Sequence, residues 1–203
     1  MKTNLLLSAC FILFLNLDAD AEVLVPSSYT ATPGEGIAQG GAYNYFDETG
    51  SQLIDGIYGA NNRHANLRKG PAYEWVGWRV ANPIITFYFP EPVTIDQVGI
   101  NFNRTKCAAL IHFPSTVNIG GTDFTVADNA ILVGTHGMVD FSGSWTGTTL
   151  TVTLTDNDPK RWIFVDEITF DGVASFAVPE PSALVLAIGA LGFLAIRGRR
   201  CAV

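Results

Sequence analysis

Cysteine is scarce in this 203-residue chain, and the positions of its cysteines argue against a disulfide framework in the central part. Cys10 and Cys201 lie in apolar regions at the two ends, which leaves Cys107 as the single cysteine between them. If both ends are removed from the mature protein, no intrachain disulfide can form. The central part must therefore be stabilised by a hydrophobic core, with or without the help of a bound metal.

Positive charge is also scarce. Charged residues make up 15% of the chain, and its formal net charge is −7 at pH 7. Between residues 22 and 178 there are 16 acidic and 8 basic residues, which gives a net charge of −8 with neutral histidines. Because an acidic surface repels phosphate backbones, we expect no nucleic-acid partner. Acidic side chains on loops are instead compatible with a hard cation such as calcium.

Sequence signatures of common enzymes are missing. The chain has no nucleophile elbow, HExxH, phosphate-binding loop or CxxC motif. A pair of carboxylates for glycoside hydrolysis is defined in space rather than in sequence, so a secreted hydrolase stays open as an alternative. Asp166 and Glu167 are adjacent, and alternation along a strand predicts that they point to opposite faces and form no such pair. We therefore predict a non-enzymatic protein.

Helical periodicity is absent from the middle of the chain, where apolar residues recur with a period of two. In residues 148–155 a strict alternation places Leu150, Val152 and Leu154 on one face. Further runs with strand character cover residues 83–90, 93–102 and 162–170, and turn residues separate them. The sequence predicts an all-β domain over residues 22–177, arranged as an antiparallel two-sheet sandwich.

The first residues have the features of a secretory signal peptide. Lys2 supplies a positive charge, residues 5–15 are apolar, and Ala19 and Ala21 are small residues at the positions that signal peptidase requires. We expect cleavage before Glu22, so that residues 1–21 form a helical signal. A lipoprotein signal ending at Cys10 is the alternative, but it would leave almost no apolar region before the cysteine.

The chain ends in a second apolar segment, residues 183–196. As a helix it would span about 21 Å, which is shorter than a hydrocarbon core of about 30 Å. Arg197, Arg199 and Arg200 follow the segment and would stay on the cytoplasmic side of a membrane. This helix can halt export, but it makes a marginal permanent anchor.

Pro179, Glu180 and Pro181 stand just before this helix. The Pro-Glu-Pro triplet, the short apolar helix and the arginine cluster resemble the PEP-CTERM sorting signal of exported proteins in Gram-negative bacteria, which here covers residues 178–203. The resemblance implies transient insertion in the inner membrane, cleavage by an exosortase near the triplet, and release to the cell surface or extracellular matrix. The two prolines keep the site extended and unpaired, as a processing enzyme requires. A plain anchor after a proline-containing linker is the alternative.

Several landmarks in the middle of the chain occur in a characteristic order. They are residues 53–56, 75–78, the strand pair 84–89 and 93–102, 113–119, and 164–172. This order resembles the discoidin-like, galactose-binding-like jelly roll of coagulation-factor C-type domains and many carbohydrate-binding modules. The resemblance implies a jelly-roll sandwich whose loops bind ligands at one end.

The same resemblance implies a structural calcium ion. In that family an early Asp-Gly loop and an acidic residue on the last strand commonly meet around calcium, and the matching residues here are Asp55 and Glu167. Calcium takes six to eight oxygen ligands, and a loop that contains glycine can turn its carbonyls inward. The alternative is that Asp55 only shapes an Asp-Gly turn and that Glu167 is a solvated strand residue.

Loop aromatics with polar neighbours would form the ligand site of such a fold, because sugar rings stack on exposed aromatic faces. Trp75 and Trp78 could instead belong to the core, and Trp145 and Trp162 are expected there. We predict an exported surface or matrix protein that binds extracellular polysaccharide, with a purely structural envelope component as the alternative. The candidate ligand-binding residues are Tyr58, Asn62, Arg63, His64, Tyr73 and Trp75.

Overall fold

A computed structural model describes residues 21–38, 41–59, 74–104, 111–126, 136–158 and 160–174. The expected signal peptide and the expected sorting segment lie outside the described residues, and so do Asn62, Arg63, His64 and Tyr73. Within the described ranges the chain forms strands and no helix, as the period of two predicts. None of these residues belongs to a helix that is long and apolar enough to cross a membrane.

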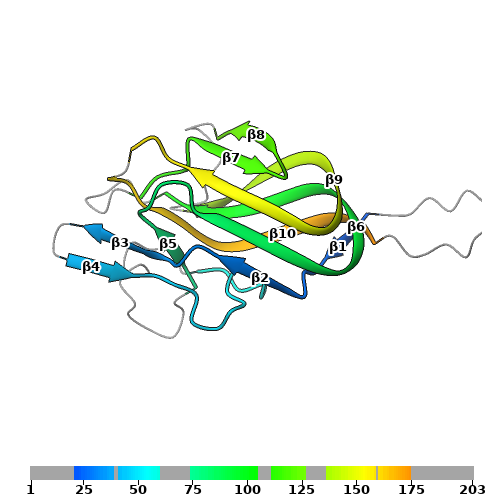
Figure 1. The fold of residues 1–203 in the computed structure, drawn as a ribbon, viewed down its shortest axis with the longest axis horizontal. Helices are drawn as coiled ribbons and strands as arrows, with labels where there is room; N and C mark the ends of the chain where they lie inside the picture. Colours follow the sequence, from blue (N-terminus) through cyan, green and yellow to red (C-terminus); the bar gives the residue numbers. More distant parts are fainter. Residues whose placement is uncertain are drawn as a thin grey trace, which may run out of the picture.

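Ten strands make up the fold (Figure 1). Eight are joined in one antiparallel sheet, in which the order β1-β10-β6-β9-β7-β8 is extended by β2 on β6 and by β5 on β10, while β3 and β4 form a separate hairpin. The strands are β1 (Glu22–Leu24), β2 (Ser28–Ala31), β3 (Glu35–Ala38), β4 (Gly41–Asn44), β5 (Val76–Trp78), β6 (Ile84–Asn103), β7 (Thr116–Ile119), β8 (Thr122–Thr125), β9 (His136–Thr155) and β10 (Ile163–Ala174).

The two long strands β6 and β9 connect two layers of the sheet. Their pairing is interrupted between Tyr88 and Val93 and again between Ile95 and Gln97. Pro90 and Pro92 lie in the first interruption, where prolines are tolerated because they have no N–H to donate to the ladder. The first half of β6 pairs with β2 and the end of β9, whereas its second half pairs with β10 and the start of β9. The sheet therefore folds over on itself, as Figure 1 shows.

The core fills the space between these layers. Phe87 in the first half of β6 packs edge-on against Phe170 of β10, with ring centroids 4.8 Å apart. Leu150, Val152 and Leu154 are all buried, which confirms the inward face predicted for residues 148–155. Trp145 belongs to the same cluster and donates from Nε1 to the carbonyl of Ile119 at 2.9 Å.

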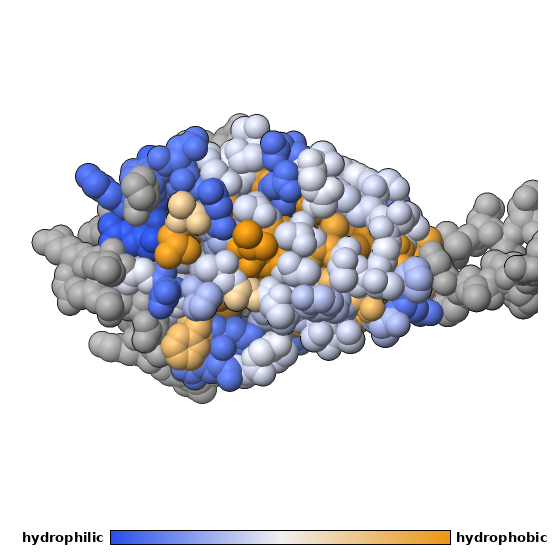
Figure 2. Space-filling model, viewed as in Figure 1, coloured by the Kyte–Doolittle hydropathy of each residue, from blue (hydrophilic) through white to orange (hydrophobic). Residues whose placement is uncertain are grey.

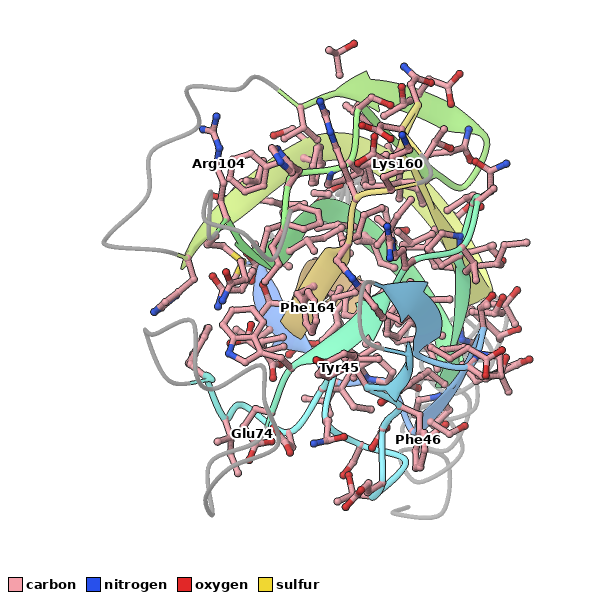
Figure 3. The ribbon with its side chains drawn as sticks, turned by 90° about the vertical axis from the view of Figure 1, so that its left-hand side faces the viewer. Tyr45, Phe46, Glu74, Arg104, Lys160 and Phe164 are labelled. Carbon is pink, nitrogen blue, oxygen red and sulfur yellow. The ribbon has the colours of Figure 1, made fainter. Side chains whose placement is uncertain are left out.

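A second buried cluster, made largely of aromatic residues, lies at the end of the molecule that faces the viewer in Figure 3. Tyr45 packs edge-on against Phe164 at 4.9 Å and against Trp162 at 5.1 Å between ring centroids. Trp75 and Ile111 complete the cluster. The expectation that Trp145 and Trp162 are core residues is confirmed, since both are buried.

Candidate functional site

The loop over residues 55–59 is the segment on which the calcium and ligand expectations converge. Gly56 has a φ of 77°, a left-handed conformation that favours glycine, and Asp55 Oδ1 accepts a hydrogen bond from the N–H of Ile57 at 2.9 Å. Asp55 therefore shapes the turn with one carboxylate oxygen. The side chain of Asp55 is exposed.

Two adjacent carboxylates of β10 hold this loop against the sheet. The N–H of Gly56 donates to Glu167 Oε2 at 2.9 Å, and the N–H of Gly59 donates to Asp166 Oδ2 at 2.6 Å. Just before the loop, the carbonyl of Leu53 accepts the N–H of Ile168 at 2.8 Å. We call the two carboxylates with Gly56 and Gly59 the acidic clamp. It joins residues that are more than 100 positions apart in the sequence.

A β-bulge in β10 directs both carboxylates toward the same loop. The register of β10 on β6 shifts between Val165 and Glu167, so Asp166 is the extra residue of the bulge. Asn101 of β6 donates from Nδ2 to Asp166 Oδ1 at 2.7 Å. The prediction that Asp166 and Glu167 diverge to opposite faces is therefore wrong, because simple alternation does not hold at a bulge.

Burial makes both acids unusually hard to ionise. Asp166 is fully buried, and desolvation raises its pKa to about 7 against the opposing effect of hydrogen bonds from Gly59 and Asn101. Desolvation also raises the pKa of Glu167 to about 7; the Gly56 hydrogen bond opposes this shift, and the charges of Asp55 and Asp166 add to it. A bound cation would favour the ionised forms of these two acids and so oppose the shift.

The donor chemistry around Asp55 and Glu167 suits calcium. Both side chains offer hard carboxylate oxygens, and each has an oxygen that is not used in the hydrogen bonds described above. No three His, Cys, Asp or Glu side chains of the described ranges gather into a metal-binding group. A calcium ion here would therefore need backbone carbonyls as further ligands, and calcium binding stays a prediction.

Trp75 takes a different place from the one expected of a ligand-binding residue. Its side chain has no exposed surface, so it offers no face for a sugar ring. The indole packs on the backbone of Gly59, where a Cβ would lie 2.2 Å from Nε1, and on the ring of His136, at 5.9 Å between centroids. Trp75 supports the loop from beneath, as the alternative assignment to the core requires.

Of the two candidate ligand residues within the described ranges, Tyr58 is accessible and Trp75 is not. It is 51% exposed, and its neighbour Ile57 is 52% exposed, between the two glycines of the acidic clamp. Partial burial and the charges of Glu167 and Asp166 raise the pKa of Tyr58. The ring therefore projects from a loop whose backbone is tied down on both sides.

Sequence reasoning missed Asp166, Asn101 and Glu74 as members of this region. Burial and the charge of Asp55 raise the pKa of Glu74, whose label in Figure 3 lies beside the segment that carries the loop. The bulge is evident in the burial pattern rather than in the sequence, where Phe164, Ile168 and Phe170 keep an even spacing. The inward apolar residues of β10 step by two from Ile163 to Val165 but by three from Val165 to Ile168. Such a change of phase is typical of a bulge.

Comparison with known proteins does not assign this chain to a family. No family model matches the chain, and no curated protein matches its sequence. Solved structures to which this chain is similar include the family 32 carbohydrate-binding module of C. perfringens NanJ in complex with galactose. That module is 13% identical, with a TM-score of 0.41, and the match covers 75% of this chain and 99% of that chain.

Two further solved structures are similar to this chain. Chitosan-binding module 1 of a chitosanase/glucanase from Paenibacillus sp. IK-5 is 16% identical with a TM-score of 0.38, over 72% of this chain and 95% of that chain. A truncated AlyQ with a family 32 module and an alginate lyase domain is 16% identical with a TM-score of 0.44. That match covers 78% of this chain but 35% of that chain.

Proposed function

We propose that this chain is an exported, non-catalytic protein of the cell surface or extracellular matrix that binds polysaccharide through the loop over residues 55–59. The observation that carries the proposal is the exposure of Tyr58 on a loop held by the acidic clamp. A loop whose backbone is already fixed loses little conformational entropy when a sugar stacks on its aromatic ring, so more of the binding energy is retained.

The buried acids support a binding role rather than hydrolysis. Asp166 has no exposed surface and Glu167 is 3% exposed, and both carboxylates accept loop amides. A general acid and its partner must reach a glycosidic bond in the substrate. In their described positions these two acids reach the loop instead.

We further propose that Asp55 and Glu167 hold a calcium ion that braces the loop. The negative charges that surround Glu167 support this, since Asp55 and Asp166 both raise its pKa. When bound, the cation would neutralise these charges and lock the ends of the loop to β10. Its role would be structural.

The proposal that the protein is exported and sorted rests on the sequence features of its two ends. We propose removal of residues 1–21 by signal peptidase and cleavage by an exosortase near Pro179, Glu180 and Pro181. Intact-mass analysis of the exported protein tests both steps. A mature C-terminus that still carries Arg199 and Arg200 would contradict the sorting proposal.

A glycan array probed with the exported protein tests the binding proposal. We expect binding to at least one polysaccharide fragment and loss of at least tenfold in affinity for Tyr58→Ala, as removal of a stacked aromatic ring predicts. The matched control is Phe46→Ala, which removes another exposed aromatic ring outside the loop. An array without any bound glycan would favour the structural component, and release of sugar products would favour the hydrolase.

A further inference from the structure

The outward side of the front layer is built almost entirely from hydroxyl side chains. In β9, the residues that alternate with buried Leu150, Val152 and Leu154 are threonines. The neighbouring strands continue the pattern, and we call the combined surface the threonine face. Its residues are Ser28 and Thr30 of β2, Ile84, Thr86 and Tyr88 of β6, Thr149, Thr151, Thr153 and Thr155 of β9, and Thr116 and Asn118 of β7.

These hydroxyls stand in register across strands. Thr30 is opposite Thr86, and Thr86 is opposite Thr151, so the three form one row across β2, β6 and β9. Thr86 Oγ1 and Thr151 Oγ1 are 3.1 Å apart, within hydrogen-bond distance. Sheet geometry separates rows by about 6.8 Å along a strand and columns by about 4.8 Å between strands. The face is thus a regular array of groups that both donate and accept hydrogen bonds.

The threonine face carries no Asp, Glu, Lys, Arg or His at its described β2, β6, β9 and β7 positions. Figure 2, which looks onto this layer, shows mostly near-white surface over β2, β6 and β9. The β propensity of threonine accounts for threonines on strands. It does not account for the missing charges on β2, which pairs with β6 alone, because natural edge strands commonly carry lysine or other charged residues. The nearest charge in the same layer is at its edge on β8, where Asp123 lies opposite Asn118 and accepts a hydrogen bond from Asn118 Nδ2 at 2.6 Å.

We propose that the threonine face is a second binding surface, for a neutral polysaccharide chain that lies across the strands. Its uncharged surface matches an uncharged polymer, whereas an acidic polymer would find no cation on it to pair with. Threonine hydroxyls can hydrogen-bond sugar hydroxyls while the threonine methyls, with Ile84 and Tyr88, contact the C–H faces of the rings.

Two physical features favour a single polymer chain over other occupants. Adjacent strands twist by about 20–25°, so a flexible chain can follow the rows but a flat crystalline lattice cannot match them over several strands. Protein interfaces concentrate aromatic and apolar anchors at their centre. Here Ile84 is 48% exposed and Tyr88 is 37% exposed, while most of the remaining positions carry hydroxyl groups. The inference shares the ligand class of the proposed function but uses none of its loop residues.

Affinity electrophoresis of the exported protein tests this surface, with galactomannan and hydroxyethylcellulose as neutral probes and polygalacturonate as the acidic probe. We expect retardation by a neutral probe that does not weaken with salt, and at least a tenfold weaker affinity for Thr86→Val/Thr151→Val. These substitutions remove hydroxyls and keep the β-branched shape. The matched control is Thr146→Val, at an exposed position of β9 beyond the face, which should bind as the native chain does.

A second variant, Thr151→Lys, keeps the proposal testable if the double variant fails to fold, because substitutions of exposed side chains usually change stability little. It should also lose retardation by the neutral probe. Unchanged retardation of both folded variants, equal loss in Thr146→Val, or binding confined to polygalacturonate would overturn the proposal. So would self-association that disappears in Thr151→Lys, which would identify a second copy as the occupant.

The same gels separate this surface from the loop. Retention of neutral-probe binding in Tyr58→Ala, with loss in Thr86→Val/Thr151→Val, supports the threonine face whether or not the loop proposal holds. Loss of all glycan binding in Tyr58→Ala, with full binding in the threonine variants, would overturn the threonine face and leave the loop proposal standing.

Discussion

The N–H of Gly59 donates to Asp166 Oδ2 at 2.6 Å, and this bond ties a surface loop to an acid with no exposed surface. Asp166 also accepts Asn101 Nδ2 at 2.7 Å, so its two oxygens connect the loop to the middle of the sheet. The carboxylate is therefore the common partner of two donors from separate elements. The effect of removing this shared carboxylate on the free energy of unfolding can be measured.

Asp166→Ala leaves the Gly59 N–H and the Asn101 amide buried without their acceptor. Each buried donor that loses its partner costs about 1–3 kcal/mol, so we expect about 3 kcal/mol less free energy of unfolding. Urea unfolding followed by tryptophan fluorescence measures this loss. Asp123→Ala is the matched control, since Asp123 is exposed and should cost less than about 1 kcal/mol. Equal effects of the two substitutions would show that Asp166 does not hold the loop.

Gly59→Ala tests the packing of the loop on Trp75. A Cβ at position 59 would lie 2.2 Å from Trp75 Nε1, and the buried indole has little room to move away. We expect destabilisation of about 1–3 kcal/mol, the range for overpacking. Trp75→Phe in the same chain shortens the obstructing ring and should recover part of that loss. A double-mutant cycle without such coupling would contradict the close contact.

The metal-free protein should be more stable in mild acid than in mild base. Asp166 and Glu167 have pKa values of about 7 in the folded state, whereas unfolded carboxyl groups titrate near pH 4. Between about pH 4 and about pH 7 the folded state therefore binds more protons than the unfolded state. Protonation of these two acids stabilises the fold in mild acid, and this contribution is lost as pH rises through 7. Thermal unfolding in chelator should show a higher midpoint at about pH 5 than at about pH 8. Asp166→Asn should reduce the difference between the two unfolding midpoints. A midpoint of the native chain that rises with pH would contradict the prediction.

The stabilisation that calcium provides should increase with pH, whereas the stability of the metal-free protein should decrease. At about pH 8 both clamp acids are ionised, so calcium should raise the unfolding midpoint more there than at about pH 5, where protons compete. Glu167→Gln should abolish the calcium response, whereas Glu91→Gln, away from the loop on β6, should keep it. A midpoint that does not move between calcium and chelator would remove the calcium proposal.

Most strands could be predicted from the sequence because their inward residues follow a regular period. Residues 148–155 alternate without a break, and their buried face is the one expected. The prolines that seemed to divide residues 83–102 into two strands lie instead within β6, at an interruption of its pairing. Proline shows where a ladder bond is missing, but the pairing partners that keep the strand continuous are far away in sequence.

The candidate site was harder to predict because it depends on contacts between distant segments. Asp55 and Glu167 were matched through family motifs, and the structure brings their loop and strand together. The role of Asp166 follows from a bulge, which overrides alternation, and from the approach of Gly59. Trp75 is two residues away from Tyr73 in the sequence, yet its burial is decided by packing on Gly59 and His136.

The pairing of β1 with β10 has a consequence for how the domain would be displayed. Glu22 lies opposite Gly172, so the first and last described strands meet at one end of the molecule (Figure 1). Whatever is joined before residue 22 or after residue 174 departs from that pole. A tether there would leave the threonine face on the flank of the domain.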